Sequence, residues 1–266
     1  MGTSKSSDGP ASGVSLVPPW VGDIPPDDDS NAASAGDPSA GLQEAVAQTA
    51  RFRDARRSLG KFAEGGNTRD LRRALAHYVS HGYGGSSSLS RRLSGTAAAA
   101  GRLDRVLDTE HSREGTEVRD HFLQSGSNAD EVMDALVDAV RPIDGSQDAE
   151  SARRSIREAL SDLLDIYPDA DLLNLDKAQR DFVIERFTAL DIYGRLCLDL
   201  EKSVMAKTDV LTALNRLAEI RDFIVQSVSS AFRKVRASLS STTSASIARI
   251  TKLVLSETFA VFEEYT

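Results

Sequence analysis

The sequence predicts an all-α protein, a multi-helix bundle preceded by a long disordered N-terminal arm. Apolar residues recur at the three-to-four spacing of a helix through most of the chain after residue 45. No run shows the alternation typical of a strand, and the first 40 residues are mainly Gly, Ser, Ala, Pro and Asp. We therefore expect a disordered tail at residues 1–44, a basic helical module at 45–107 and a helical bundle at 108–266.

The tail offers too little apolar surface to offset the entropy lost on folding, so we expect it to be mobile in isolation. One block within it is stiffer, because each proline fixes φ and biases the preceding residue toward extended conformations. A short polyproline II segment there would present the only tryptophan of the chain to a partner's groove. This block consists of Val17, Pro18, Pro19 and Trp20.

Two helices are expected at the start of the basic module. The first runs from Gly41 or Leu42 to Phe62, and the pair of glycines that follows ends it. The second begins at a capping residue, Asn67 or Thr68, and carries an aspartate in its first turn.

Glycines separate the second helix from a third. We expect the second helix to stop at Gly82 and residues 82–88 to form a flexible loop, because this segment is rich in Gly and Ser. Residues 89–107 then form a basic helix interrupted at Gly95 and Gly101.

The bundle begins with an ambiguous polar segment at 108–127. A helix then starts at Asn128, where Glu131 completes a capping box, and Pro142 ends it. Further helices are expected over residues 148–167 and 176–206, each with an apolar side.

The strongest helical periodicity lies between residues 209 and 240, and a last helix begins near Ile247. Apolar residues follow the helical spacing with Arg221 as the one polar interruption, so we expect one long side of this helix to be buried. The expected stripe is Leu211, Leu214, Ala218, Val225, Val228, Phe232, Val235 and Leu239, broadened by Leu217, Ile220 and Ile224.

Charge is distributed unevenly along the chain, whose net charge is -8. Residues 51–105 carry 12 basic and 4 acidic side chains, whereas residues 106–201 carry 10 basic and 23 acidic ones. Either the two segments neutralise each other or the basic one is kept for a partner. The single cysteine fits a reducing compartment, and neither an apolar leader nor a long apolar stretch is present, so we expect a cytoplasmic protein without a membrane anchor.

Arginines of the basic segment are candidates for contact with an anion or nucleic acid. A loop at 82–88 followed by two arginines could hold an anion at a helix start, although a plain loop is the simpler interpretation. The candidate residues are Arg56, Arg57, Arg72, Arg73, Arg91 and Arg92.

Enzymatic and metal chemistry have little support in the sequence. His77 and His81 are four residues apart, but two ligands do not make a metal site, and surface histidines are the simpler interpretation. Cys197 lies on an apolar helix without a nearby histidine, so we expect a packed side chain rather than a nucleophile. We predict no catalytic residues, no cofactor and no metal.

The N-terminal tip is a candidate modification site. Gly2 follows a methionine that is commonly removed, which would leave an accessible α-amine. The first six residues also match the myristoylation pattern, but a single acyl chain anchors weakly and seven acids in residues 1–50 would repel an anionic membrane. We therefore favour another use of the free glycine.

The chain resembles the QatB family of the four-gene bacterial Qat anti-phage defence systems. The resemblance covers roughly the first hundred residues and depends on three blocks. These are Met1-Gly2-Thr3-Ser4-Lys5-Ser6, Leu16-Val17-Pro18-Pro19-Trp20, and Arg56-Arg57-Ser58-Leu59-Gly60-Lys61-Phe62 running into Leu75-Ala76-His77-Tyr78 and Gly84-Gly85.

The resemblance implies a non-enzymatic subunit encoded with an ATPase (QatA), a QueC-like enzyme (QatC) and a TatD-like nuclease (QatD). A QueC-like enzyme implies ATP-dependent activation of a deazaguanine carboxylate, and our hypothesis is that Gly2 is the acceptor. The expected docking residues for QatC are Thr3, Ser4, Lys5 and the Val17–Trp20 block, while the body binds other components. A nucleic-acid-binding adaptor that uses residues 51–105 is the alternative.

Overall fold

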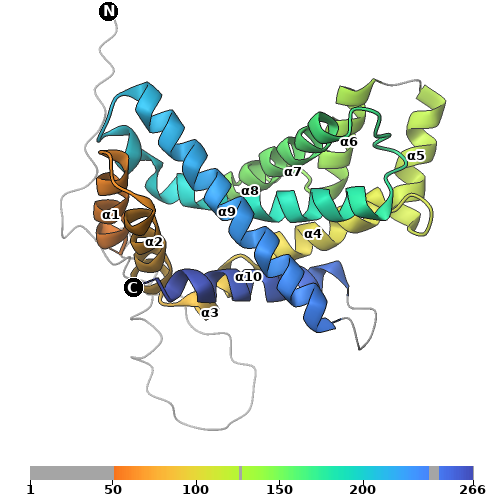
Figure 1. Cartoon of the computed structure of the whole chain (residues 1–266). Coiled ribbons are helices and arrows are strands. Elements are labelled where there is room, and N and C mark those ends of the chain that lie inside the picture. Colours follow the sequence, from red (N-terminus) through yellow and green to blue (C-terminus); the bar gives the residue numbers. More distant parts are fainter. Residues whose placement is uncertain (1–50, 126–127, 240–245, 266) are drawn as a thin grey trace, which may run out of the picture. The chain divides into compact units, whose positions relative to one another are not determined.

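Helices account for the regular structure of residues 51–125, 128–239 and 246–265, which are the residues that the computed structural model describes (Figure 1). These residues contain ten α-helices, one short π-helix and no strand, so the predicted all-α class is confirmed. The predicted arm and the first part of the first predicted helix lie outside the described residues. The helices are α1 (Arg53–Ala63), α2 (Thr68–His77), the π-helix η2 (Tyr78–Gly82), α3 (Ser86–Arg92), α4 (Ser94–Leu107), α5 (Arg113–Ser125), α6 (Ala129–Val140), α7 (Gln147–Ile166), α8 (Lys177–Met205), α9 (Val210–Leu239) and α10 (Ile247–Glu263).

Capping residues fix several helix starts where the sequence predicts them. Asn67 precedes α2, and its side chain accepts a hydrogen bond from the Arg69 N–H at 2.9 Å while Asp70 accepts one from the Asn67 N–H at 3.2 Å. Asn128 and Glu131 form the same reciprocal pair at the start of α6. Each pair satisfies backbone donors that the helix itself leaves unpaired.

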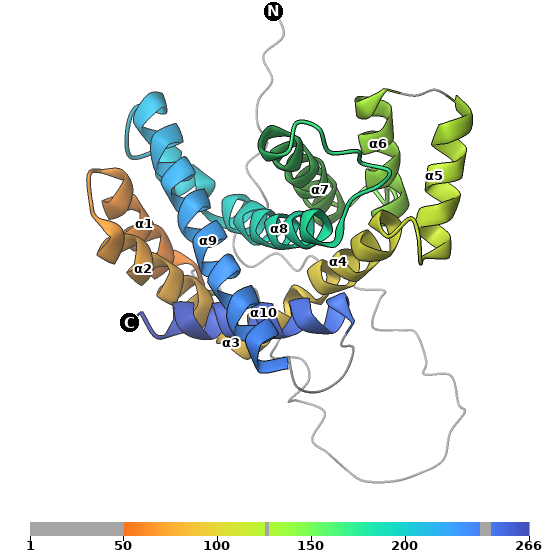
Figure 2. The ribbon, with the colours of Figure 1, turned by 45° about the vertical axis from the view of Figure 1, so that its right-hand side comes forward.

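Helix α8 is the central element of the helical unit and packs against α7, α9, α4 and α1. Helix α10 lies across α4, α9, α3 and α2, so the last described helix covers early ones. In the two views, α1 and α2 lie side by side on one flank of this unit and α5 and α6 on the other (Figures 1 and 2). Helices before residue 107 thus pack against helices after it. The predicted division into a basic module at 45–107 and a bundle at 108–266 stays a prediction.

The core consists mainly of aliphatic side chains with a few phenylalanines at helix crossings. Phe187 of α8, Phe232 of α9 and Phe262 of α10 are buried. Glycine allows one close crossing, since a Cβ at Gly101 of α4 would lie 2.8 Å from the Cβ of Ala248 in α10. None of the described helices has both the length and the apolar character that crossing a membrane requires.

The structure corrects three details in the first hundred residues. Arg51 and Phe52 form a turn and α1 starts at Arg53, so the first predicted helix is not continuous. The predicted loop at 82–88 shortens, because α3 starts at Ser86, whose N–H donates to the Glu263 carboxylate at 3.0 Å. Helices α3 and α4 are separated at Leu93, and neither predicted glycine interrupts α4.

The buried stripe of α9 is rotated from the predicted one in its first half. Leu211 and Leu214 are 69% and 53% exposed, whereas Ile220 and Ile224 are fully buried. Farther along, Val228, Phe232 and Val235 are buried as expected. Arg221 is half-buried and contacts Glu158 at 2.7 Å and Asp162 at 3.0 Å, so carboxylates of α7 compensate its charge.

Candidate functional site

The six candidate arginines all lie exposed on the first three helices. None of them forms an ion pair with a carboxylate in the part of the chain that the structure describes. Two lie on each helix: Arg56 and Arg57 on α1, Arg72 and Arg73 on α2, and Arg91 and Arg92 on α3. Among the described residues, no carboxylate therefore neutralises their charges by direct contact.

The acidic residues of the bundle pair mainly with arginines of the bundle itself. Asp162 contacts Arg186 at 3.1 Å, and Asp181 contacts Arg236 at 3.2 Å. Among the described residues, Arg105 with Glu114 at 3.4 Å is the ion pair that joins segment 51–105 to the carboxylates of 106–201. Within the described residues, ion pairing with the bundle thus leaves these six arginines without a carboxylate partner, although Arg56 donates to the Asp199 carbonyl at 3.3 Å.

Three aromatic rings form a cluster beside some of these arginines. The Phe52 ring stacks on Tyr78 with their centres 5.6 Å apart, and Tyr83 lies edge-on to Tyr78 at 5.2 Å. Such geometry favours cation–π contacts with nearby guanidinium groups. Those groups are Arg51 at 4.4 Å and Arg56 at 5.8 Å from the Phe52 ring centre, and Arg92 at 5.8 Å from the Tyr83 ring centre.

The π-helix explains how the two tyrosines come together. In an α-helix, residues five apart point about 140° away from each other, but the wider turn of η2 bonds residues five apart and brings both onto one side. Gly82 completes the arrangement, because a Cβ there would lie 2.6 Å from the Phe52 ring. Tyr78 and Tyr83 consequently point to the same carboxylate on α8.

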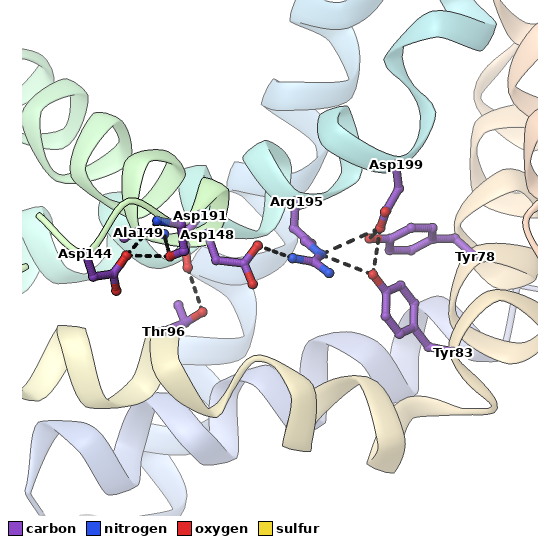
Figure 3. A network of polar contacts seen from close by, with 10 residues as sticks. Tyr78, Tyr83, Thr96, Asp144, Asp148, Ala149, Asp191, Arg195 and Asp199 are labelled. Atoms are coloured by element: carbon purple, nitrogen blue, oxygen red, sulfur yellow. Dashed lines mark hydrogen bonds and ion pairs between the residues drawn. The ribbon is translucent and has the colours of Figure 1, made fainter. Parts of the chain in front are cut away.

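That carboxylate belongs to Asp199 and is the centre of a polar network, shown in Figure 3. It accepts hydrogen bonds from the hydroxyls of Tyr78 at 2.9 Å and Tyr83 at 2.6 Å. Arg195, one turn earlier on α8, donates through Nε to the Tyr83 hydroxyl at 3.1 Å and contacts Asp148 of α7. The network thus ties η2, α7 and α8 together at one point.

Burial sets the protonation of this network. Burial raises the pKa of Tyr78 well above its ordinary value, and the neighbouring Tyr83 and Asp199 raise it further. Burial likewise raises the pKa of Tyr83, as does its hydrogen bond to Asp199. Both hydroxyls therefore stay protonated near neutral pH and donate to Asp199, while the Tyr83 oxygen accepts from Arg195.

Sequence reasoning did not identify Tyr78, Tyr83, Arg195 and Asp199 as a group. A weak signal was present, since Arg195 and Asp199 are opposite charges one turn apart on the same helix face. The two tyrosines flanking His81-Gly82 were a weaker signal. Neither indicates that segments more than a hundred residues apart in the sequence meet.

The predicted modification and docking residues fall outside the described part of the chain. The structure therefore gives no geometry for them. These residues are Gly2, Thr3, Ser4, Lys5, Val17, Pro18, Pro19 and Trp20.

The histidine pair and the cysteine have ordinary surroundings. The His77 and His81 rings stack with their centres 5.0 Å apart, and burial followed by the His81 charge lowers the pKa of His77. In the residues that can be described, no three His, Cys, Asp or Glu side chains form a group that could hold a metal ion. Burial raises the pKa of Cys197 to about 11, so its thiol is protonated near neutral pH.

Comparison with known proteins assigns the family. No curated protein and no solved structure matches the chain. A family model described as "Qat anti-phage system associated protein QatB" matches residues 84–262, which is more than half of the 266 residues. The match includes α3 to α9 and nearly all of α10, and with them Arg195 and Asp199. The chain therefore belongs to the QatB family and is a component of a Qat anti-phage defence system.

Proposed function

We propose that this protein is a non-enzymatic cytoplasmic subunit of its defence system, whose N-terminal tail docks on the QueC-like partner QatC and is modified by it at Gly2. The proposal rests on membership of the QatB family together with the sequence at the start of the chain. That sequence has a glycine at position 2 and, farther on, a proline-rich segment with one tryptophan. In this proposal the helical body contacts the ATPase QatA and the nuclease QatD.

The proposed chemistry is formation of an amide bond on the α-amine of Gly2. An α-amine has a pKa of ~8, so a useful fraction is unprotonated at neutral pH, whereas a lysine amine with a pKa of ~10.4 is almost fully protonated. The nitrogen attacks the ATP-activated deazaguanine carboxylate and the new C–N bond forms. The bond between the acyl carbon and its phosphate leaving group breaks, and the amine loses one proton to solvent.

The segment around Trp20 would act as a docking handle. Its prolines restrict the free chain, so docking loses less entropy than docking of an ordinary flexible peptide. Binding at this segment raises the effective concentration of the tip at the active site of the partner. Thr3, Ser4 and Lys5 would then lie next to the reacting amine and contact the partner directly.

Intact mass measurement tests this proposal. We expect the chain produced with its partner genes to lack Met1 and to carry a nucleobase-sized mass increment that is absent when the chain is produced alone. Gly2→Pro should lose the increment, because the amine becomes secondary and hindered, while Gly2→Ala retains a primary amine and should keep part of it. Trp20→Ala should reduce the modified fraction severalfold.

Two outcomes would contradict the acceptor role of Gly2. One is an unmodified Met1 in the complete system. The other is an increment that persists in Gly2→Pro, which would place the modification on a different residue.

A second candidate function, a nucleic-acid-binding adaptor, is favoured by the six exposed arginines, which form no ion pair with any carboxylate that the structure describes. Phosphate contacts release counterions, so the logarithm of affinity should fall with the logarithm of salt concentration by about 0.9 for each phosphate contacted on duplex DNA. Replacing Arg56, Arg57, Arg72 and Arg73 with glutamine should remove about four of these contacts. We expect the slope to fall by about four.

Fluorescence anisotropy with a labelled 20-base-pair duplex measures this slope. The matched control makes the same change of charge on other helices, at Arg113, Arg154, Lys177 and Arg233, all exposed. The control should retain the slope of the unchanged protein. Equal losses in both variants would show that only total charge matters, and no binding at 50 mM salt would exclude the adaptor function.

A further inference from the structure

A small charged cleft lies beside the Asp199 network, between the α3–α4 junction, the start of α7 and the middle of α8. Its volume is about 90 Å³. Five charged side chains line it: Arg92, Arg141, Asp148, Asp191 and Arg195. Figure 3 shows Asp148, Asp191 and Arg195 together with Thr96, which also lines the cleft.

The carboxylates of the cleft are already engaged. Asp191 accepts a hydrogen bond from the Thr96 hydroxyl at 2.6 Å, and Asp148 is paired with Arg195. Arg141 contacts the exposed Asp144 at 3.0 Å. The lining contains three arginines and two aspartates, so its side chains carry one net positive charge when both aspartates are ionised. Arg92 forms no ion pair with a described carboxylate.

The start of α4 adds to this charge. Gly95 and Thr96 belong to its first turn and line the cleft. The Thr96 N–H donates to the Leu93 carbonyl at 3.1 Å, so the contribution of the helix start is its dipole, which is positive at this end. Nothing lies within 4 Å of where a Gly95 Cβ would be, so the space beside this residue is open. The electrostatics of the cleft therefore favour an anion over an amine.

We propose that this cleft binds a terminal phosphate or sulfate group of a small molecule, with Arg92 and Arg195 as its main ligands. The volume is smaller than the about 150 Å³ that accommodates benzene, so it suits a single oxyanion while the remainder of the molecule lies outside. A terminal group fits a recessed cleft better than a diester, whose chain continues on both sides. The proposal does not depend on modification of Gly2.

Asp191 makes the affinity depend on pH. Burial raises its pKa to about 6, and the charge of Asp148 also raises it, while Thr96, Arg195 and Arg141 lower it. Below pH 6 the carboxyl is mostly neutral and no longer repels an anion. Binding of an anion favours the protonated form, so affinity should increase as the pH falls through 6.

Calorimetric titration of the full chain with sulfate tests the proposal, because the charge of sulfate does not change between pH 5 and 8. We expect saturable binding at pH 7 that becomes severalfold tighter at pH 5.5. Arg92→Gln should weaken it at least tenfold. Arg91→Gln is the matched control, since Arg91 is equally exposed on the same helix but does not line the cleft, and it should retain affinity within twofold.

Two further experiments test the role of Asp191 and identify which chemical group the cleft binds. Asp191→Asn should bind sulfate at pH 7 as tightly as the unchanged protein does at pH 5.5, and its affinity should not vary with pH. Adenosine monophosphate should displace sulfate, whereas adenosine and a hydroxyl-terminated oligonucleotide should not. The proposal fails if sulfate shows no saturable binding or if acetate binds as well as sulfate. It also fails if Arg92→Gln and Arg91→Gln lose affinity equally, or if sulfate binds more tightly at pH 7 than at pH 5.5.

Discussion

Ile220→Ala is expected to lower the free energy of unfolding by about 2–5 kcal/mol. Ile220 lies in the middle of α9 and is fully buried, so truncation leaves a cavity that surrounding helices fill only partly. Leu214→Ala removes the same number of carbon atoms from the same helix, but Leu214 is 53% exposed. That variant should change stability by less than about 0.5 kcal/mol.

Urea denaturation followed by circular dichroism measures both values on the full chain. The comparison tests which side of α9 is buried, because the sequence alone favoured a stripe that includes Leu214. Equal destabilisation by the two variants would contradict the orientation described here.

Asp199→Ala is expected to destabilise the fold by about 3 kcal/mol, within the range for breaking a largely buried charged network. The change leaves the buried Tyr78 hydroxyl without its acceptor and takes a partner from Tyr83 and Arg195. A buried unsatisfied donor alone costs about 1–3 kcal/mol. Thermal and urea unfolding of the purified protein measure the loss.

Two further variants separate the network from simple packing. Asp199→Asn keeps an acceptor of the same shape and should cost less than Asp199→Ala. Combining Asp199→Ala with Tyr78→Phe removes the orphaned hydroxyl, so the double variant should be more stable than the sum of the single effects predicts. Strict additivity would show that Tyr78 and Asp199 act independently.

The class of fold and many helix boundaries could be predicted because they depend on local chemistry. The capping residues Asn67 and Asn128 act within one turn of their helices, and Pro142 and Pro168 each follow the end of a helix for steric reasons. Such signals need no knowledge of distant segments. The long apolar periodicities of α7 to α10 likewise identify helices whatever they pack against.

The orientation of a helix is harder to predict when apolar residues cover more than half of its circumference. Helix α9 carries a leucine at both position 214 and position 217, so residue type does not distinguish them. Packing against α8 and α10 decides that Leu217 is the buried one. The start of α3 depends on Glu263, which is 177 residues away. No local pattern contains that information.

The candidate site was predictable only in its simplest part. The basic composition of residues 51–105 identifies arginines for a partner, because charge can be counted. Composition does not show that Arg56 and Arg92 form no ion pair with a described carboxylate. That depends on the folded structure, in which carboxylates of α6 and α7 pair with other arginines of the bundle. The cleft near Asp191 needs four separate helices and the segment between α6 and α7 to exist at all.

The contact between Ser86 and Glu263 has a consequence for biosynthesis. A ribosome that adds roughly 5–20 residues each second needs about 10–35 seconds to cover the 177 positions between them. During this interval α3 and α4 have left the ribosome without α10, the helix that covers them in the finished protein. The apolar surface that α10 covers in the finished protein is therefore exposed on the nascent chain until the last helix is made.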